Sequence, residues 1–128
     1  MSLVGNSLLA KTYTAPTAIN PYLIVKWGSN DGEVAQASAA TDLLIGVVNS
    51  VGSVSSNDRI EVNRSGLVPV LFGGTVTRGQ KLTADSNGKA VAAAPSAGSN
   101  VHIVGVAENS QVSGDIGYIQ ISLSVMQG

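Results

Sequence analysis

The sequence predicts an all-β domain, and three observations support that prediction. Seventeen valines and eight isoleucines stand against one phenylalanine and one tryptophan, and β-branched side chains suit a pleated sheet better than a helix. Fifteen glycines supply turns. Apolar residues alternate at a period of two, and no ten-residue stretch shows a helical period bounded by caps. We therefore expect a single compact domain that resembles a β-barrel or a β-sandwich.

Length, charge and cysteine content narrow the function classes. A chain of 128 residues fits one domain that buries about two-thirds of its unfolded surface. The absence of cysteine excludes thiol catalysis and thiolate metal sites. The net charge of -1 and the lack of a Lys/Arg cluster argue against a nucleic-acid partner. No run approaches the roughly 18 apolar residues of a membrane span, and no signal peptide is recognised, so we expect cytoplasmic synthesis and no membrane partner.

The first 22 residues differ from the rest because they lack a clean period and contain Pro16 and Pro21. Proline has no amide hydrogen to donate to a central strand, so residues 1–22 are predicted to be an extended arm or edge segment, followed by a β-rich domain at 23–128. An extended arm can add a strand to the sheet edge of a partner. The side chains expected to make that contact are Leu8, Leu9, Tyr13, Pro16, Ile19, Pro21 and Tyr22.

Alternating or fully apolar runs separated by turn residues predict the strands of the main domain. Turns are expected at 29–33 and at the D-S-N-G sequence of 85–88. Pro69 indicates an edge or a bulge. The best helical candidate is the alanine-rich stretch 35–44. The predicted extended segments are 22–28, 34–39, 43–48, 58–66, 67–74, the hairpin 76–91, and the strands that begin at 102 and 115.

Two segments of the chain repeat one pattern. Residues 43–62 read LLIGVVNSVGSVSSNDRIEV, and residues 102–121 read HIVGVAENSQVSGDIGYIQI. The loops inside them differ by two residues, which surface loops tolerate easily. We therefore expect two equivalent strand–loop–strand units that build two halves of one barrel-like domain. The matched positions are Gly46 with Gly105 and Asp58 with Asp115.

The sequence does not favour a catalytic site or a metal site. His102 is the single histidine, and its period-two spacing with Val104 and Val106 is typical of a strand end or surface position. One imidazole without cysteine cannot fill a zinc shell. We expect no enzyme, no cofactor and no metal site. Turn formation is the expected role of the aspartates that adjoin Gly, Asn or Ser, which are Asp31, Asp58, Asp85 and Asp115.

The few aromatic residues are the remaining candidates for a contact surface. Tryptophan and tyrosine are favoured anchors at protein interfaces. Tyr13 and Tyr22 flank the proline-containing arm, which favours a contact role for them. In a domain with so few aromatic side chains, a core role and a place in an oligomer interface both stay open for Trp27 and Phe72.

The order of these segments resembles the small capsid decoration, or cement, proteins of tailed bacteriophages, over residues 22–122. The most distinctive part is VTRGQKLTADSNGKAV at 76–91, followed by GVAENSQVSGD at 105–115. The segment IVKWGSNDGEVAQASAATDLLIGVV at 24–48 is similar in layout to the core of the lambda-type head decoration protein.

The resemblance implies a β-clip-like or jelly-roll-like domain, homotrimeric or else dimeric. Such a protein is made in the host cytoplasm, binds the outer surface of the virion, and clamps neighbouring major capsid subunits of the expanded head, with its arm ordered on the capsid. The alternative is a virion-displayed binding module, namely a head fibre base or a glycan-binding domain. Glycan binding favours exposed aromatic residues on loops, and loops 49–57 and 92–100 contain none. A small hydrolase would need an acid or base partner near His102.

Overall fold

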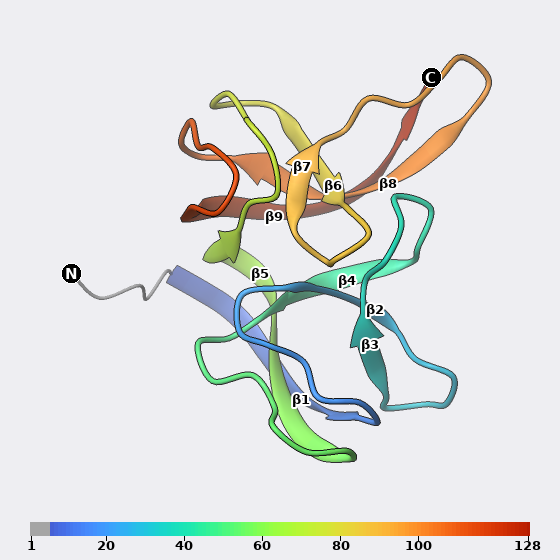
Figure 1. Cartoon of the computed structure of the whole chain (residues 1–128), viewed down its shortest axis with the longest axis vertical. Coiled ribbons are helices and arrows are strands. Elements are labelled where there is room, and N and C mark those ends of the chain that lie inside the picture. The colour runs from blue at the N-terminus through green and yellow to red at the C-terminus, as the bar shows by residue number, and fades with distance from the viewer. Residues whose placement is uncertain (1–5) are drawn as a thin grey trace.

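The computed structural model describes residues 6–128 as nine β-strands, with no helix among them (Figure 1). The all-β prediction is confirmed, and the helical candidate at 35–44 consists of strand ends and turns. This part of the chain accordingly offers no helix able to cross a membrane. The strands are β1 (Asn6–Ala15), β2 (Ile24–Trp27), β3 (Val34–Gln36), β4 (Leu44–Val48), β5 (Asp58–Leu71), β6 (Lys81–Ala84), β7 (Ala90–Ala92), β8 (Asn100–Ala107) and β9 (Ile116–Gln127).

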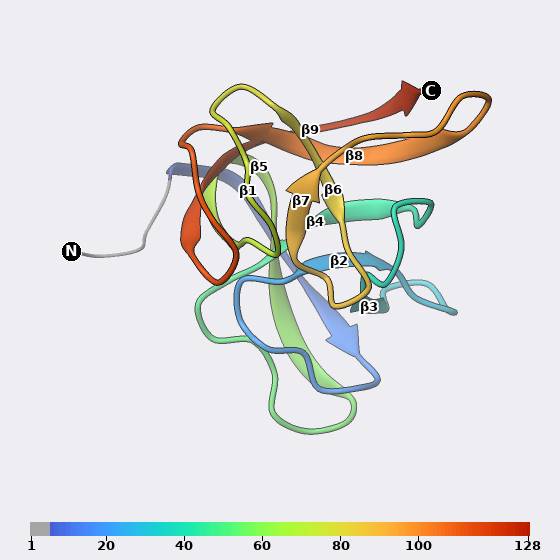
Figure 2. The same cartoon turned by 45° about the horizontal axis from the view of Figure 1, so that its top comes forward.

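All nine strands belong to one antiparallel sheet in the order β3-β2-β4-β5-β9-β8-β6-β7, with β1 on β5. The sheet does not close into a barrel, so the sandwich-like expectation holds and the barrel does not. It curls instead into two lobes that lie one above the other in both views (Figures 1 and 2). We define the first lobe as β1–β4 with residues 58–65 of β5, and the second as residues 66–71 of β5 with β6–β9.

The two lobes are structural repeats. In the first lobe Thr14 of the opening strand pairs with Arg59 of the closing strand, and in the second Leu71 pairs with Ile116. Each residue of the second pair lies 57 positions after its counterpart. The short inner strands β2 and β6 also take equivalent places, because each has a residue opposite the matched glycine of β4 or β8. The repeat predicted from two sequence segments therefore extends over both whole lobes.

The matched residues have the same structural roles in both lobes. Asp58 and Asp115 each accept a hydrogen bond from the backbone N–H three positions earlier, at 2.9 and 3.1 Å, and so shape equivalent turns. Gly46 and Gly105 each lie so close to a carbonyl of the neighbouring strand that a Cβ would collide with it. The repeated pattern thus specifies architecture.

The same positive-φ backbone conformations recur in both lobes. Among the described residues, the non-glycine residues with positive φ are Tyr22 at 67° and Asn57 at 65°. The positions 57 residues later are Gly79, with φ 91°, and Gly114, with φ 92°. A left-handed conformation costs most side chains about 1–2 kcal/mol. The first lobe therefore keeps two conformations that the second lobe makes with glycine.

Residues 6–15 differ from the separate arm expected for 1–22. They form β1, which pairs with β5 along its length, and Pro16 follows directly after its end. Tyr13 and Ile19 belong to the core of the first lobe. The physical reason is that β1 covers the inner face of the first lobe, as residues 66–71 of β5 cover that of the second. Of the two predicted alternatives, an extended arm or an edge segment, the edge segment describes β1 better, because β1 has a strand partner on one side.

Strand β5 joins two segments that the sequence analysis separated at residues 66 and 67. Pro69 pairs with Tyr118 of β9 on one edge of β5. On the opposite edge the described pairing with β1 stops at Leu67, and the N–H of Leu71 points there to the carbonyl of Tyr22. The missing amide hydrogen of Pro69 falls on this same edge, since residues two apart point alike. Among residues 6–128, Pro69 therefore has a strand partner on the β9 side alone.

The buried side chains form two clusters. One lies under β1 within the first lobe, and the other fills the second lobe and extends to the outer face of the first. Ile24 and Val47 of the first lobe belong to this shared cluster. The residue equivalent to Ile24 in the second lobe is the exposed Lys81. The second lobe therefore has a polar residue where the first has an apolar contact, as expected of a terminal repeat.

Substitution at Gly114 tests the equivalence of the two loops. Gly114 has positive φ, and nothing lies within 4 Å of the place that a Cβ would take, so strain alone decides the effect. Gly114→Val is expected to lower the free energy of unfolding by about 1–2 kcal/mol. Gly114→Asn should cost less than half as much, because asparagine holds the equivalent position 57. Urea denaturation measures both, and equal losses would contradict the equivalence.

Candidate interaction surface

The structure separates the side chains predicted to bind a partner into buried and exposed ones. Tyr13 and Ile19 are 2% and 1% exposed, so they fill the core of their own chain and no pocket of a partner. Leu9 is 52% exposed on β1, and the side chain of Leu8 lies outside the described residues. The half-buried members of the set are Pro16, Pro21 and Tyr22.

Trp27 and Phe72, for which the sequence left a core role and an interface role open, have different environments. Phe72 is fully buried in the core shared by the lobes, so the core role applies to it. Trp27, at the end of β2, is 44% exposed. Trp27 is therefore the one of the two that is available for contact with a partner.

Trp27 is held by a small cluster of aromatic and cationic side chains. The Tyr13 and Trp27 rings meet edge to face, with centroids 6.0 Å apart and planes at 81°. The Arg64 guanidinium lies 5.3 Å from the Trp27 ring centroid and donates a hydrogen bond of 3.2 Å to the Tyr13 hydroxyl. The Lys11 ammonium lies 4.9 Å from the Tyr13 ring. These contacts join β1, β2 and β5 and give the indole a fixed position.

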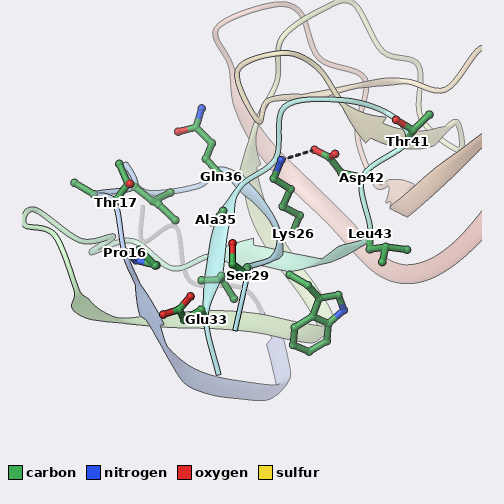
Figure 3. Close-up of a pocket in the computed structure, with 15 residues that line it drawn as sticks. Pro16, Thr17, Lys26, Ser29, Glu33, Ala35, Gln36, Thr41, Asp42 and Leu43 are labelled. Carbon is green, nitrogen blue, oxygen red and sulfur yellow. Dashed lines mark ion pairs between the residues drawn. The ribbon is translucent and has the colours of Figure 1, made fainter. Parts of the chain in front are cut away.

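A hollow of about 740 Å³ borders Trp27 (Figure 3). Residues 16–19 line one part of it, and the hairpin of β2 and β3, with its turn, and residues 41–43 line the rest. Figure 3 shows Lys26 reaching toward Asp42, with 3.4 Å between Nζ and Oδ2. The hollow thus combines apolar side chains with polar ones, the carboxylate of Glu33 and one partly exposed ion pair.

Asp42 organises the turn between β3 and β4, which borders this hollow and contacts the second lobe. Its carboxylate accepts backbone hydrogen bonds from Ser38, at 2.8 Å, and Ala39, at 3.0 Å. Burial alone raises the pKa of Asp42, but these hydrogen bonds and the charge of Lys26 outweigh burial and hold the pKa below its usual value. The Asp42 carbonyl lies 2.8 Å from Nδ1 of His102 in β8. The predicted strand-end histidine therefore contributes a contact between the lobes.

A second hollow, of about 340 Å³, lies where the two lobes meet. Four large apolar side chains on its wall are exposed by 43–62%, and we call them the apolar strip. The lining residues include no Lys, Arg, Asp or Glu. Of the four, sequence reasoning identified Trp27 and missed the others, although the uncharged stretch after residue 115 was a signal. The strip consists of Trp27, Leu43, Leu123 and Val125.

Comparisons with known proteins bear on the fold. No protein-family model and no curated protein matches the chain. Among solved structures, the head fibre gp8.5 N base of bacteriophage phi29 is similar, with a TM-score of 0.65 and 22% sequence identity. The match covers 89% of this chain and 93% of that one. At this identity the likeness establishes a shared fold.

The carboxylate of Asp42 provides a pH-dependent prediction. Because its pKa is lowered in the folded state, its stabilisation is present above the unfolded carboxyl pKa of about 3.9 and is lost as pH falls through the folded pKa. Asp42→Asn should therefore be less stable than the natural chain at pH 7, with a difference that shrinks below about pH 4. Urea denaturation across this range measures it, and a pH-independent difference would contradict the role of the charge.

Proposed function

We propose that the protein is a structural component of a tailed-phage head, without enzymatic activity, that binds the outer surface of the capsid. The observation that supports this most is the fold likeness to a head fibre base, which runs through nearly the full length of both chains. The decoration-protein pattern of residues 22–122 points independently to the same location.

Within this proposal the protein acts either as the base of a larger head appendage or as a clamp between neighbouring major capsid subunits. The fold likeness favours the base, and the sequence resemblance favours the clamp. Both roles need a rigid body with a surface that a capsid recognises. A glycan-binding role has weaker support, because Arg64 already lies over the ring of the exposed Trp27.

The edge of β1 is the surface that we assign to the capsid contact. Within the described residues, β1 has a strand partner on the β5 side, and its other side meets the chain at the single bridge of Thr14 with Glu33. An open strand edge accepts a strand from a partner through backbone hydrogen bonds, and side chains on alternate positions give register. Among the β1 side chains that the structure describes, Leu9 is the large apolar one that is exposed. In this proposal the segment expected to contact the capsid does so as strand β1 of the sheet, and not as a free arm.

The test is co-sedimentation of the folded protein with expanded and unexpanded heads of its phage. Saturable binding to expanded heads is expected, and Leu9→Glu should weaken it by about tenfold or more, as truncation of an interface anchor does. Val112→Glu is the matched control, because Val112 is 54% exposed against 52% for Leu9 and lies in the loop before β9.

Deleting residues 1–22 is unsuitable for this test, because it would remove Tyr13 and Ile19 from the core. Absence of binding to either kind of head by a folded protein would contradict attachment to the capsid. Equal weakening by the substitutions at Leu9 and Val112 would contradict the assignment to β1.

A further inference from the structure

Four equivalent positions are apolar and buried in the second lobe but carry cations or aromatic rings in the first. The second-lobe residues are 7% exposed or less, belong to one core cluster, and are Val68, Val70, Ala84 and Ile121. The residues 57 positions earlier are Lys11, Tyr13, Trp27 and Arg64. The strand pairings agree, because the partner of Lys11 is Val62 and that of Val68 lies 57 positions later. The first lobe therefore departs from its repeat at a place where an apolar core was the simpler solution.

The two cations of this cluster, Lys11 and Arg64, have no carboxylate partner among residues 6–128, which hold all eight acidic residues of the chain. The one ion pair within these residues joins Lys26 to Asp42. Glu33 lines the same hollow as Trp27, but its carboxylate accepts a hydrogen bond from Asn30. The positive charges of Lys11 and Arg64 are thus left uncompensated.

The half-buried Arg64 is also short of hydrogen-bond acceptors. Its guanidinium donates to the Tyr13 hydroxyl, and its Nε is buried without an acceptor within the described residues. A cation that loses hydration is compensated only by an opposite charge or by hydrogen bonds. Proteins keep such unsatisfied groups mainly where function needs them. Arg64 therefore has the features of a residue that a partner completes.

The surroundings of the two cations suit a polypeptide. Lys11 belongs to β1, whose edge away from β5 meets the rest of the described chain at the single bridge of Thr14 with Glu33. A strand that pairs there places side chains beside those of β1, and opposite charges on neighbouring strands stabilise the pair. The exposed Leu9 and Trp27 add apolar contact area. A nucleic acid would need a broad basic face, which a chain of net charge -1 does not provide.

We propose that Arg64 and Lys11 bind acidic side chains of a protein partner that pairs as a strand with β1. The Arg64 guanidinium, held over the Trp27 ring, receives a carboxylate, because arginine N–H groups match carboxylate geometry. This inference rests on the proposed function, since it gives the partner chemistry of the contact assigned to β1.

Titration of the folded chain with peptides, in the absence of heads, tests the proposal. The probe is a peptide of alternating threonine and glutamate, and its control has glutamine in place of glutamate. The fluorescence of Trp27, the single tryptophan, reports binding. The glutamate peptide should bind about tenfold or more tightly than the control, as a hydrogen bond between charged groups provides. Added salt should reduce the difference.

Three substitutions locate the binding site. Arg64→Met removes the charge but keeps an unbranched stem, so affinity for the glutamate peptide should fall by about tenfold or more. This variant should unfold at the same urea concentration as the natural chain or at a higher one, because an unpaired half-buried charge is gone. Lys11→Met, at an exposed side chain, should weaken binding by a smaller factor. Arg78→Met is the matched control, because Arg78 is exposed between β5 and β6, and it should bind like the natural chain.

Equal affinity for the two peptides, or equal losses in Arg64→Met and Arg78→Met, would overturn the proposal. Co-sedimentation with expanded heads separates this failure from that of the proposed function. Natural chain and Arg64→Met that bind heads equally well would overturn the acidic contact and leave attachment to the capsid standing. A natural chain that binds the glutamate peptide but no head would overturn attachment to the capsid and support an acidic partner of another kind.

Discussion

The rest of the structure depends on one strand that serves two lobes. The first part of the 14-residue β5 closes the first lobe by pairing with β1 and β4, and its last part opens the second lobe by pairing with β9. Because the backbone passes between the lobes without a linker, neither lobe can rotate without disturbing ladder hydrogen bonds of the other. The same strand carries Arg64, which holds Trp27. The surfaces assigned to partners are therefore positioned by β5.

Repetition accounts for the architecture, and the differences between the repeats account for the interaction surface. The glycines and aspartates that shape turns and close strand contacts are equivalent in both lobes. The residues of the apolar strip are not: the positions equivalent to Trp27 and Leu43 are Ala84 and His102. The residues that shape the repeated fold and the residues of the apolar strip are thus different sets, as expected when a surface feature is added to a scaffold.

Local signals predicted much of this fold. Turn residues and period-two alternation located most strands, the hairpin turn at 85–88 and the repeat, because a few adjacent residues determine those features. The place of β1 was missed, since covering the inner face of the first lobe depends on side chains of β2, β4 and β5 that are distant in sequence. The apolar strip was missed except for Trp27, because three segments distant in sequence, β2, residue 43 and β9, must come together to form it. Tertiary contacts of this kind leave no local periodic signal.

Native-state hydrogen exchange in increasing urea tests the central claim, which is that β5 makes the two lobes one cooperative unit. Amides of β4 in the first lobe and of β8 in the second should converge on the same opening free energy, because unfolding either lobe breaks the strand that the other needs. Two groups of amides that stay separated by more than about 1 kcal/mol would show independent foldons. That result would contradict a single unit built on a shared strand.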